Sequence, residues 1–201
     1  DIVGLYMNPP DNAVVLSVDE KTQIQALDRT QPGLPLNPSR IGSRTHDYKR
    51  HGTAALYAAF NTLTGKVIGK VTDKTNGKEF LSFLKLLNRR VSADKDLHII
   101  LDNLSAHKAP AVREWLEAHP RIHLHFTPTS SSWLNAVEGW FAQLERRALY
   151  RGVFTSVPEL KAELQRFINV HNAHNAKPFK WTKPAAHIIA AVGRAKHALQ
   201  N

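Results

Sequence analysis

The chain has 201 residues, of which 42% are hydrophobic and 22% charged, and this balance excludes disordered and fibrous classes of protein. It has no cysteine, which excludes disulfides and thiolate metal sites, so any metal ion must be held by oxygen or imidazole ligands. Lysine and arginine outnumber aspartate and glutamate by 27 to 17, and the net charge of +10 favours a polyanionic partner through phosphate contacts.

The first part of the chain predicts three strands in a meander. Residues 12–20, "NAVVLSVDE", are rich in β-branched side chains and predict a strand ending near Asp19, which residues 21–28 continue or pair with. Two further strands are predicted from "TAALYAAF" and "KVIGKVT", which flank the turn "NTLTG". The segment 30–52 contains three prolines and is interpreted as a functional loop insertion. Its cations are Arg40, Arg44, Lys49 and Arg50.

Helices and strands alternate in the second part of the chain. Asn76 with Glu79 three residues later predicts a capped helix over 76–90. The elements predicted after it are a strand at 97–102, a helix at 109–119, a strand at 122–126, a helix from Ser131 or Ser132 to about Leu149, a helix after the capping box of Ser156 and Glu159, and a last helix opening at Pro184. This order predicts one α/β domain over residues 1–201, with the ribonuclease-H-like mixed five-stranded sheet flanked by helices.

Three carboxylates are expected to meet at one place in that fold. Asp19 and Asp102 end the first and fourth strands, which are neighbours in the middle of the sheet. Glu138 borders the apolar stripe of its helix and turns towards the protein. Three carboxylates raise one another's pKa unless a divalent cation lies between them. Oxygen ligands suit Mg²⁺, with Mn²⁺ as a substitute, and a pair of such ions promotes phosphodiester cleavage or transfer.

Each of these acids also has an ordinary structural explanation. Asp19 can be a solvated strand end, and Glu20 is a rival ligand, although alternation along a strand points it to the opposite face. Glu138 can form a surface ion pair, and Glu145 occupies the same helix border two turns later. We therefore expect a change at Glu20 or Glu145 to affect cleavage far less than a change at Asp102.

Three short motifs carry a resemblance to a known family. They are "VDEK" at 18–21, "LDNLSAHK" at 101–108 and "TPTSSSWLNAVEGWF" at 127–141. Together they resemble the catalytic core of bacterial insertion-sequence transposases related to the mariner superfamily. Asp102 and Glu138 are separated by 35 residues, and the last two catalytic acids of that family are separated by 34 or 35. The likeness extends from about residue 12 to about residue 185 and includes "VHNAHNAKPFKWT".

The resemblance implies roles for individual residues. Asp19, Asp102 and Glu138 would form a DDE-type triad that binds two Mg²⁺ ions. His107 matches the family's "DN…H" motif and would lie near the scissile phosphate as a proton carrier or phosphate contact, unless it only caps or packs. Trp133 and Asn135 would orient the helix that carries the glutamate. A zinc site at His171 and His174 is rejected, because nothing nearby supplies the remaining ligands.

The resemblance also implies an activity and partners. The chain would be the catalytic domain of a cut-and-paste transposase, which hydrolyses phosphodiester bonds at transposon ends and joins the 3′ ends to target DNA at TA. A homodimer would form the active complex. Double-stranded DNA would be contacted by Arg40, Arg44, Lys49, Arg50 and Lys108. Family members carry helix-turn-helix modules ahead of this core, and nothing before residue 12 matches one, so we expect them to be absent here.

Two other functions fit the same sequence. One is a ribonuclease-H-like nuclease that cleaves without strand transfer. The other is a non-catalytic DNA-binding or assembly module, which has less reason to keep three costly acids. We expect a cytoplasmic location, because no apolar run approaches the roughly 18 residues of a membrane span and the first residues do not resemble a signal peptide. The resemblance implies in addition a bacterial, nucleoid-associated protein.

Overall fold

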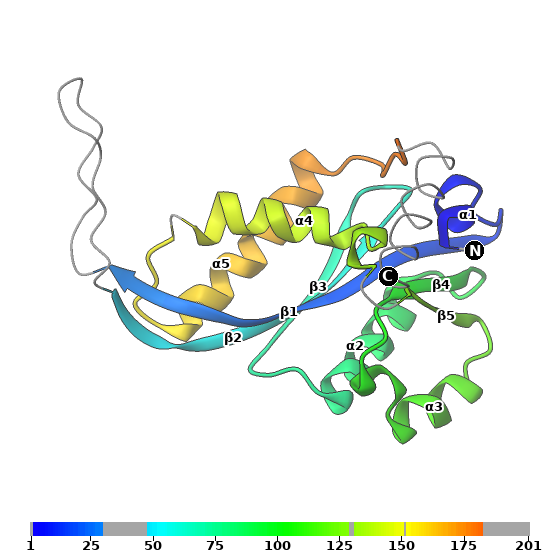
Figure 1. The fold of residues 1–201 in the computed structure, drawn as a ribbon, viewed down its shortest axis with the longest axis horizontal. Coiled ribbons are helices and arrows are strands. Elements are labelled where there is room, and N and C mark those ends of the chain that lie inside the picture. The colour runs from blue at the N-terminus through cyan, green and yellow to red at the C-terminus, as the bar shows by residue number, and fades with distance from the viewer. Residues whose placement is uncertain (1, 30–47, 129–130, 151, 183–201) are drawn as a thin grey trace, which may run out of the picture.

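The protein is described from a computed structural model, which covers residues 2–29, 48–128, 131–150 and 152–182. These residues contain a five-stranded sheet with the order β3-β2-β1-β4-β5 (Figure 1). The strands are β1 (Ala13–Arg29), β2 (Tyr48–Asn61), β3 (Val67–Thr72), β4 (Asp96–Leu101) and β5 (Ile122–Phe126). The first three strands are antiparallel, whereas β4 is parallel to both β1 and β5. The predicted mixed sheet is confirmed.

Helices cover both faces of the sheet. The α-helices are α1 (Ile2–Met7), α2 (Gly77–Arg90), α3 (Pro110–Glu117), α4 (Val137–Leu144) and α5 (Val157–Val170). Leu56 and Phe60 of β2 share one core cluster with α4 and α5, and Leu16 and Leu101 share a second with α2 and α3. Among the described residues, no helix combines the length and apolar character that a bilayer crossing requires.

β1 does not end near Asp19 but continues to Arg29, which places Asp19 inside the strand. An extra residue in β1 shifts its register against β2 between Lys21 and Ile24, and Gln23 there has a φ of 50°, in the left-handed region. The shift reverses which side chains face which layer. Ile24 therefore packs in the α4–α5 core, and this burial keeps the second half of the strand in the sheet.

Two of the predicted helix caps are confirmed. The side chain of Asn76 accepts a hydrogen bond from the Glu79 N–H at 2.9 Å, at the start of α2. The Ser156 hydroxyl accepts one from the Glu159 N–H at 3.3 Å, at the start of α5. The helix predicted to open at Pro184 lies outside the described residues.

The predicted start of α4, at Ser131 or Ser132, is wrong. A 3₁₀ turn (η2, Ser132–Leu134) comes first, and α4 begins at Val137. The N–H of Val137 donates to the hydroxyl of Ser17 on β1 at 2.8 Å. The donor at the start of the helix is thus satisfied by a residue from the sheet, which no local pattern in the sequence could indicate. The predicted end is confirmed, because a π-helical turn (η3, Glu145–Leu149) extends α4 to Leu149.

The histidine-rich segment that follows α5 has a structural role. It forms a second π-helical turn (η4, His171–Asn175) beside the turn between β2 and β3. The Asn172 side chain accepts from the Val67 N–H at 2.7 Å and donates to the Val67 carbonyl at 2.8 Å, as a neighbouring strand would. His171 Nε2 lies 2.8 Å from the Gly65 carbonyl oxygen. These contacts explain the "VHN" motif without a metal ion.

We predict that Asn172→Ala destabilises the protein by about 1–3 kcal/mol, because the substitution leaves two backbone groups of β3 unpaired. Asn169→Ala is the matched control, since Asn169 is exposed on α5 and bonds only Gln165 among the contacts described, and it should change stability by less than about 0.5 kcal/mol. Urea denaturation measures both changes. Equal effects of the two substitutions would contradict the role of Asn172.

Candidate active site

The register of β1 and β4 brings two of the predicted acids together. These strands are parallel, with Ser17 opposite Ile100. Asp19 and Asp102 each lie two residues further along, so they are level with one another in the middle of the sheet. Asp102 directly follows β4, where its side chain is 36% exposed, whereas Asp19 is inside β1 and accepts a hydrogen bond from the Glu20 N–H at 2.8 Å. The register therefore places the two residues next to each other, and their joint binding of a metal ion stays a prediction.

A buried polar contact places α4 against the same part of β1. Asn135, which is fully buried, donates from Nδ2 to the Val18 carbonyl at 2.9 Å and lies 3.3 Å from Asp19 Oδ2. The hydroxyl of Ser17 donates to Asn135 Oδ1 while accepting from the N–H of Val137. We call these two side chains the Ser17–Asn135 latch. It holds the first turn of α4, which carries Glu138, beside Asp19.

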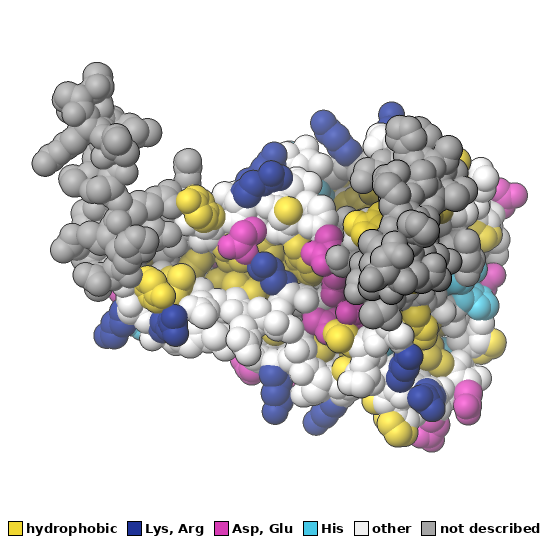
Figure 2. Space-filling model, viewed as in Figure 1, with side chains coloured by type: hydrophobic (Ala, Val, Ile, Leu, Met, Phe, Trp, Pro, Cys, Tyr) yellow, Lys and Arg dark blue, Asp and Glu magenta, His cyan; other side chains and the backbone are white. Residues whose placement is uncertain are grey.

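The negative charges at this place are not balanced. Burial raises the pKa of Asp19 to about 7, and repulsion by Glu138, Glu20 and Asp102 adds to that increase. Burial also raises the pKa of Asp102. Figure 2 shows a group of acidic side chains in the middle of this face of the molecule. Neighbouring carboxylates make it costly to ionise Asp19. A divalent cation bound between them would remove that cost.

The donor set fits Mg²⁺ or Mn²⁺ in its chemistry. Asp19, Asp102 and Glu138 offer only carboxylate oxygens, and Glu138 is exposed, so its side chain is free to approach the other two. Among the described residues, no three acidic or histidine side chains are close enough together to enclose one ion as they stand. An ion bound at this place would therefore require at least one of these side chains to change its position.

His107 is fully buried between two acids. It lies in a short 3₁₀ turn (η1, Ser105–Lys108) that follows β4. Its Nδ1 is 3.2 Å from both the carbonyl oxygen and Oδ1 of Asp102, and its Nε2 is 3.3 Å from Glu20 Oε2. The ring packs on Phe80 with 4.2 Å between ring centroids. Both ring nitrogens are thus engaged inside the protein, and the predicted contact with a scissile phosphate stays a prediction.

Aromatic rings pack around the segment that precedes α4. The hydroxyl of Tyr6 on α1 donates to the Leu134 carbonyl at 2.8 Å and accepts from the Ala136 N–H at 3.3 Å. Trp133 is exposed, with its ring 6.3 Å from that of Trp181, and the Trp181 ring stacks on Tyr6. Tyr6 thus holds the segment between Leu134 and Ala136 from the outside, and the expected part of Trp133 in orienting the helix stays a prediction.

The predicted DNA-binding residues that the structure describes do not form one patch. Lys49 and Arg50 belong to β2, because the ribbon with β1 extends further than predicted and residues 48–52 are a strand rather than a loop. Lys108 lies beside His107, with its Nζ 5.1 Å from the centre of the Phe126 ring. Arg40 and Arg44 lie outside the described residues. The three described cations therefore lie on two elements, the start of β2 and the turn η1 that follows β4.

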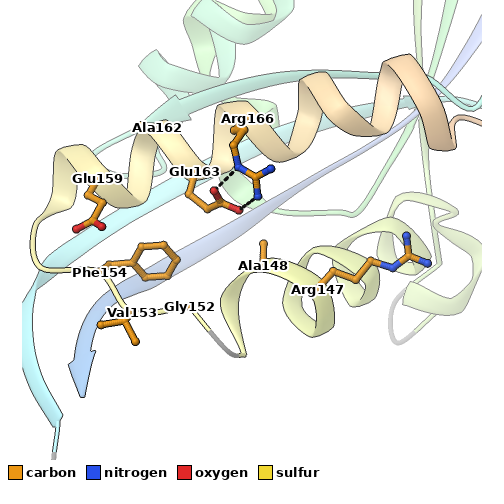
Figure 3. Close-up of a pocket in the computed structure, with 9 residues that line it drawn as sticks. All are labelled: Arg147, Ala148, Gly152, Val153, Phe154, Glu159, Ala162, Glu163 and Arg166. Carbon is orange, nitrogen blue, oxygen red and sulfur yellow. Dashed lines mark hydrogen bonds and ion pairs between the residues drawn. The ribbon is translucent and has the colours of Figure 1, made fainter. Parts of the chain in front are cut away.

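A hollow of about 620 Å³ lies away from these acids, between α5 and the segment that follows α4 (Figure 3). Its lining includes Phe154, Arg147 and the ion pair of Glu163 with Arg166, in which the guanidinium donates to both carboxylate oxygens at 2.6 Å. None of the predicted catalytic residues lines it. The candidate active site at Asp19 and Asp102 therefore lies outside this hollow.

The geometry described above agrees with a family assignment made on the sequence. A family model described as "DDE superfamily endonuclease" matches residues 15–161, which include all three predicted acids. The chain belongs to the DDE superfamily of endonucleases. The fold of this DDE domain is that of ribonuclease-H-like transposase catalytic domains, as predicted.

Individual relatives agree with this assignment. An uncharacterized 39 kDa protein of insertion element IS630 from Shigella sonnei is 26% identical over 113 residues, which are 56% of this chain and 33% of the relative. The Mos1 mariner paired end complex with Mn has a TM-score of 0.61 at 18% identity, over 84% of this chain and 52% of that chain. The catalytic domain of Mos1 transposase has a TM-score of 0.57 at 18% identity, over 84% and 75%. The DDE domain thus spans about a third of the IS630 protein and half of the first Mos1 chain.

Two residues of the DDE domain were missed or undervalued in the sequence. Ser17 is a polar residue within the apolar run "AVVLSV", and that interruption was the available signal for a buried contact. Glu20 does lie on the opposite face from Asp19, as alternation predicts, but its side chain is only 5% exposed and it contacts His107. A carboxylate so deeply buried is not an ordinary surface acid.

We predict that Asp19 makes the metal-free DDE domain less stable as the pH rises. Its pKa is raised from 3.8 to about 7, so between these values the unfolded state releases the proton first and the free energy of unfolding falls. The loss is up to about 4 kcal/mol. Asp19→Asn should remove this part of the pH dependence, as measured by urea denaturation in EDTA from pH 4 to pH 8.

Asp11→Asn is the control for this measurement, because Asp11 is an exposed aspartate just ahead of β1. It should leave the pH dependence unchanged. If Asp19→Asn and the wild-type protein lose stability equally with rising pH, Asp19 is not the strained carboxyl group of the site.

Proposed function

We propose that this DDE domain is the catalytic domain of a cut-and-paste DNA transposase, which hydrolyses phosphodiester bonds at transposon ends and joins the freed 3′ ends to target DNA. The observation that carries the proposal is the meeting of negative charge at Asp19, whose pKa is raised to about 7 by burial and by Glu138, Glu20 and Asp102. Acids with strongly raised pKa values cluster at functional sites, which is why this arrangement indicates an active site.

Asp19, Asp102 and Glu138 are the residues that would hold the metal. When bound there, two Mg²⁺ ions would activate the attacking oxygen and stabilise the leaving oxygen of the phosphodiester. Asp19 and Asp102 are held by the sheet, whereas Glu138 is exposed in the first turn of α4. The latch fixes the helix that presents Glu138, so the glutamate approaches the other two acids from one direction.

The relatives support the choice of metal and reaction. Two Mos1 catalytic-domain structures contain Raltegravir with Mg or with Mn, at 16% and 15% identity to this chain. Other Mos1 structures are a paired end complex and a strand transfer complex. We transfer from them the use of a divalent cation, the binding of transposon ends, a homodimeric active complex and a TA target. A nucleoid-associated location would follow from binding DNA.

DNA would reach the site along two sets of cations. Lys108 lies in the same turn as His107, close to Asp102, where a phosphate near the scissile bond would pass. Lys49 and Arg50 are exposed at the far end of β2 and would contact the duplex at a distance, or the second protomer. The net charge of +10 is consistent with either contact.

We predict that Asp102→Asn abolishes Mg²⁺-dependent cleavage of plasmid DNA while the protein stays folded, because the side chain is partly exposed and contributes little to packing. Glu145→Gln is the control. Glu145 is exposed in the π-helical turn that follows α4, and its Oε2 lies 3.0 Å from Lys21 Nζ. The control variant should retain most of the activity. Undiminished cleavage by Asp102→Asn would refute the triad.

The same assay separates transposition from simple cleavage when a pre-cut transposon end with a free 3′ hydroxyl is supplied. A transposase joins that end to the plasmid, and sequencing the junctions reads the target dinucleotide. Cleavage without any joined product would instead identify a ribonuclease-H-like nuclease. Binding of DNA with neither product would identify a non-catalytic module.

We predict that Lys49→Ala with Arg50→Ala makes duplex binding less dependent on salt. Each lost phosphate contact should reduce the slope of log K against log salt by about 0.9, so the double variant loses about 2. Lys85→Ala with Arg89→Ala is the matched control, because it removes the same charge from exposed positions on α2. An unchanged slope in the first variant would favour a contact with the second protomer over one with DNA.

A further inference from the structure

Glu20 is a buried acid that the triad does not explain. Its side chain is 5% exposed and lies on the face of β1 that packs against α2, together with Leu16 and Val18. A carboxylate in such surroundings is costly unless it is paired and hydrogen-bonded. Its side chain contacts His107, whose Nε2 lies 3.3 Å from Glu20 Oε2. We therefore expect the Glu20–His107 pair to have a role in its contacts with neighbouring residues.

His107 connects Glu20 to the candidate metal ligand Asp102. The other ring nitrogen, Nδ1, lies 3.2 Å from both the carbonyl oxygen and Oδ1 of Asp102. Phe80 packs on the ring and limits its rotation. The two ring nitrogens thus reach one acid each, with Nε2 next to the Glu20 carboxylate and Nδ1 next to both the backbone carbonyl and the carboxylate of Asp102.

We propose that Glu20 is a positioning residue, which acts through His107 to hold the Asp102 carboxylate in the orientation that binds the metal ion. The contact to His107 engages one carboxylate oxygen of Asp102 and leaves the other available to an ion. Residues that orient a metal ligand in this way typically change metal affinity 10- to 100-fold when they are replaced. The inference rests on the proposed function, because it requires Asp102 to be a metal ligand.

The geometry favours this role over direct ligation by Glu20. Asp102 is 36% exposed at the end of β4, where an ion from solvent can reach it, while Glu20 is almost fully covered. Alternation along β1 places Glu20 and Asp19 on opposite faces of the sheet. His107 comes from the turn after β4 and lies between Glu20 and Asp102. Glu20 therefore reaches the site only through the histidine.

The test is Mn²⁺ binding to the whole protein in the absence of DNA, measured from the electron paramagnetic resonance signal of free Mn²⁺. Glu20→Gln keeps the size of the side chain and removes its charge. We expect its Mn²⁺ affinity to fall 10- to 100-fold with the fold retained by circular dichroism. Glu145→Gln, the exposed control, should bind Mn²⁺ as the wild-type protein does.

A second variant separates positioning from direct ligation. His107→Asn removes the connection to Glu20, so adding Glu20→Gln in that background should cause no further loss of affinity. A further 10-fold loss would overturn the proposal in favour of Glu20 as a ligand. An unchanged affinity in folded Glu20→Gln would overturn it in favour of a purely structural pair.

One measurement needs no variant and therefore does not depend on a variant folding. In ¹⁵N-histidine-labelled wild-type protein, Mg²⁺ titration should shift the ring nitrogen signals of His107 at the concentration that saturates binding. A titration that saturates without moving these signals would overturn the positioning role alone. Failure of the wild-type protein to bind either ion would instead overturn the proposed function.

Discussion

The Ser17–Asn135 latch is the contact on which the arrangement of the site depends. It satisfies the first backbone donor of α4, ties the segment before that helix to β1, and approaches Asp19 with the amide of Asn135. Both side chains are buried, so each would carry an unpaired polar group without the other. Because one contact sets both the start of α4 and the environment of Asp19, the glutamate and the aspartate are positioned by the same interaction.

The acids of the site work against the stability of the fold that presents them. Burial and mutual repulsion raise the pKa of Asp19, and the only described imidazole in contact with Asp102, that of His107, faces inward towards Glu20. The two sides of β1 thus differ in kind. On one side, the Asp19 carboxylate has other acids as neighbours, where an ion can bind. On the other side, the buried Glu20 carboxylate is paired with His107.

Much of the fold could be predicted from the sequence, because its signals were local. Asn76 and Ser156 indicated helix starts because each caps a helix together with a glutamate three residues later. Asp102 indicated the end of a buried strand. The site was predictable as far as the acids, since strand order brings Asp19 and Asp102 together. The start of α4 and the burial of Glu20 were not predictable, because each depends on a contact with a residue more than 80 positions away.

The extra residue in β1 near Gln23 has a consequence for how such domains can diverge. Ahead of it, odd-numbered side chains such as Ser17 and Asp19 face α4, and after it Ile24 and Ala26 do so. The bulge therefore uncouples the two halves of one strand. A single insertion or deletion in the far half of the ribbon can be absorbed there by gaining or losing a bulge, without inverting the catalytic half. Evolution can in this way lengthen or reshape the outer ribbon while the chemistry at Asp19 stays in register.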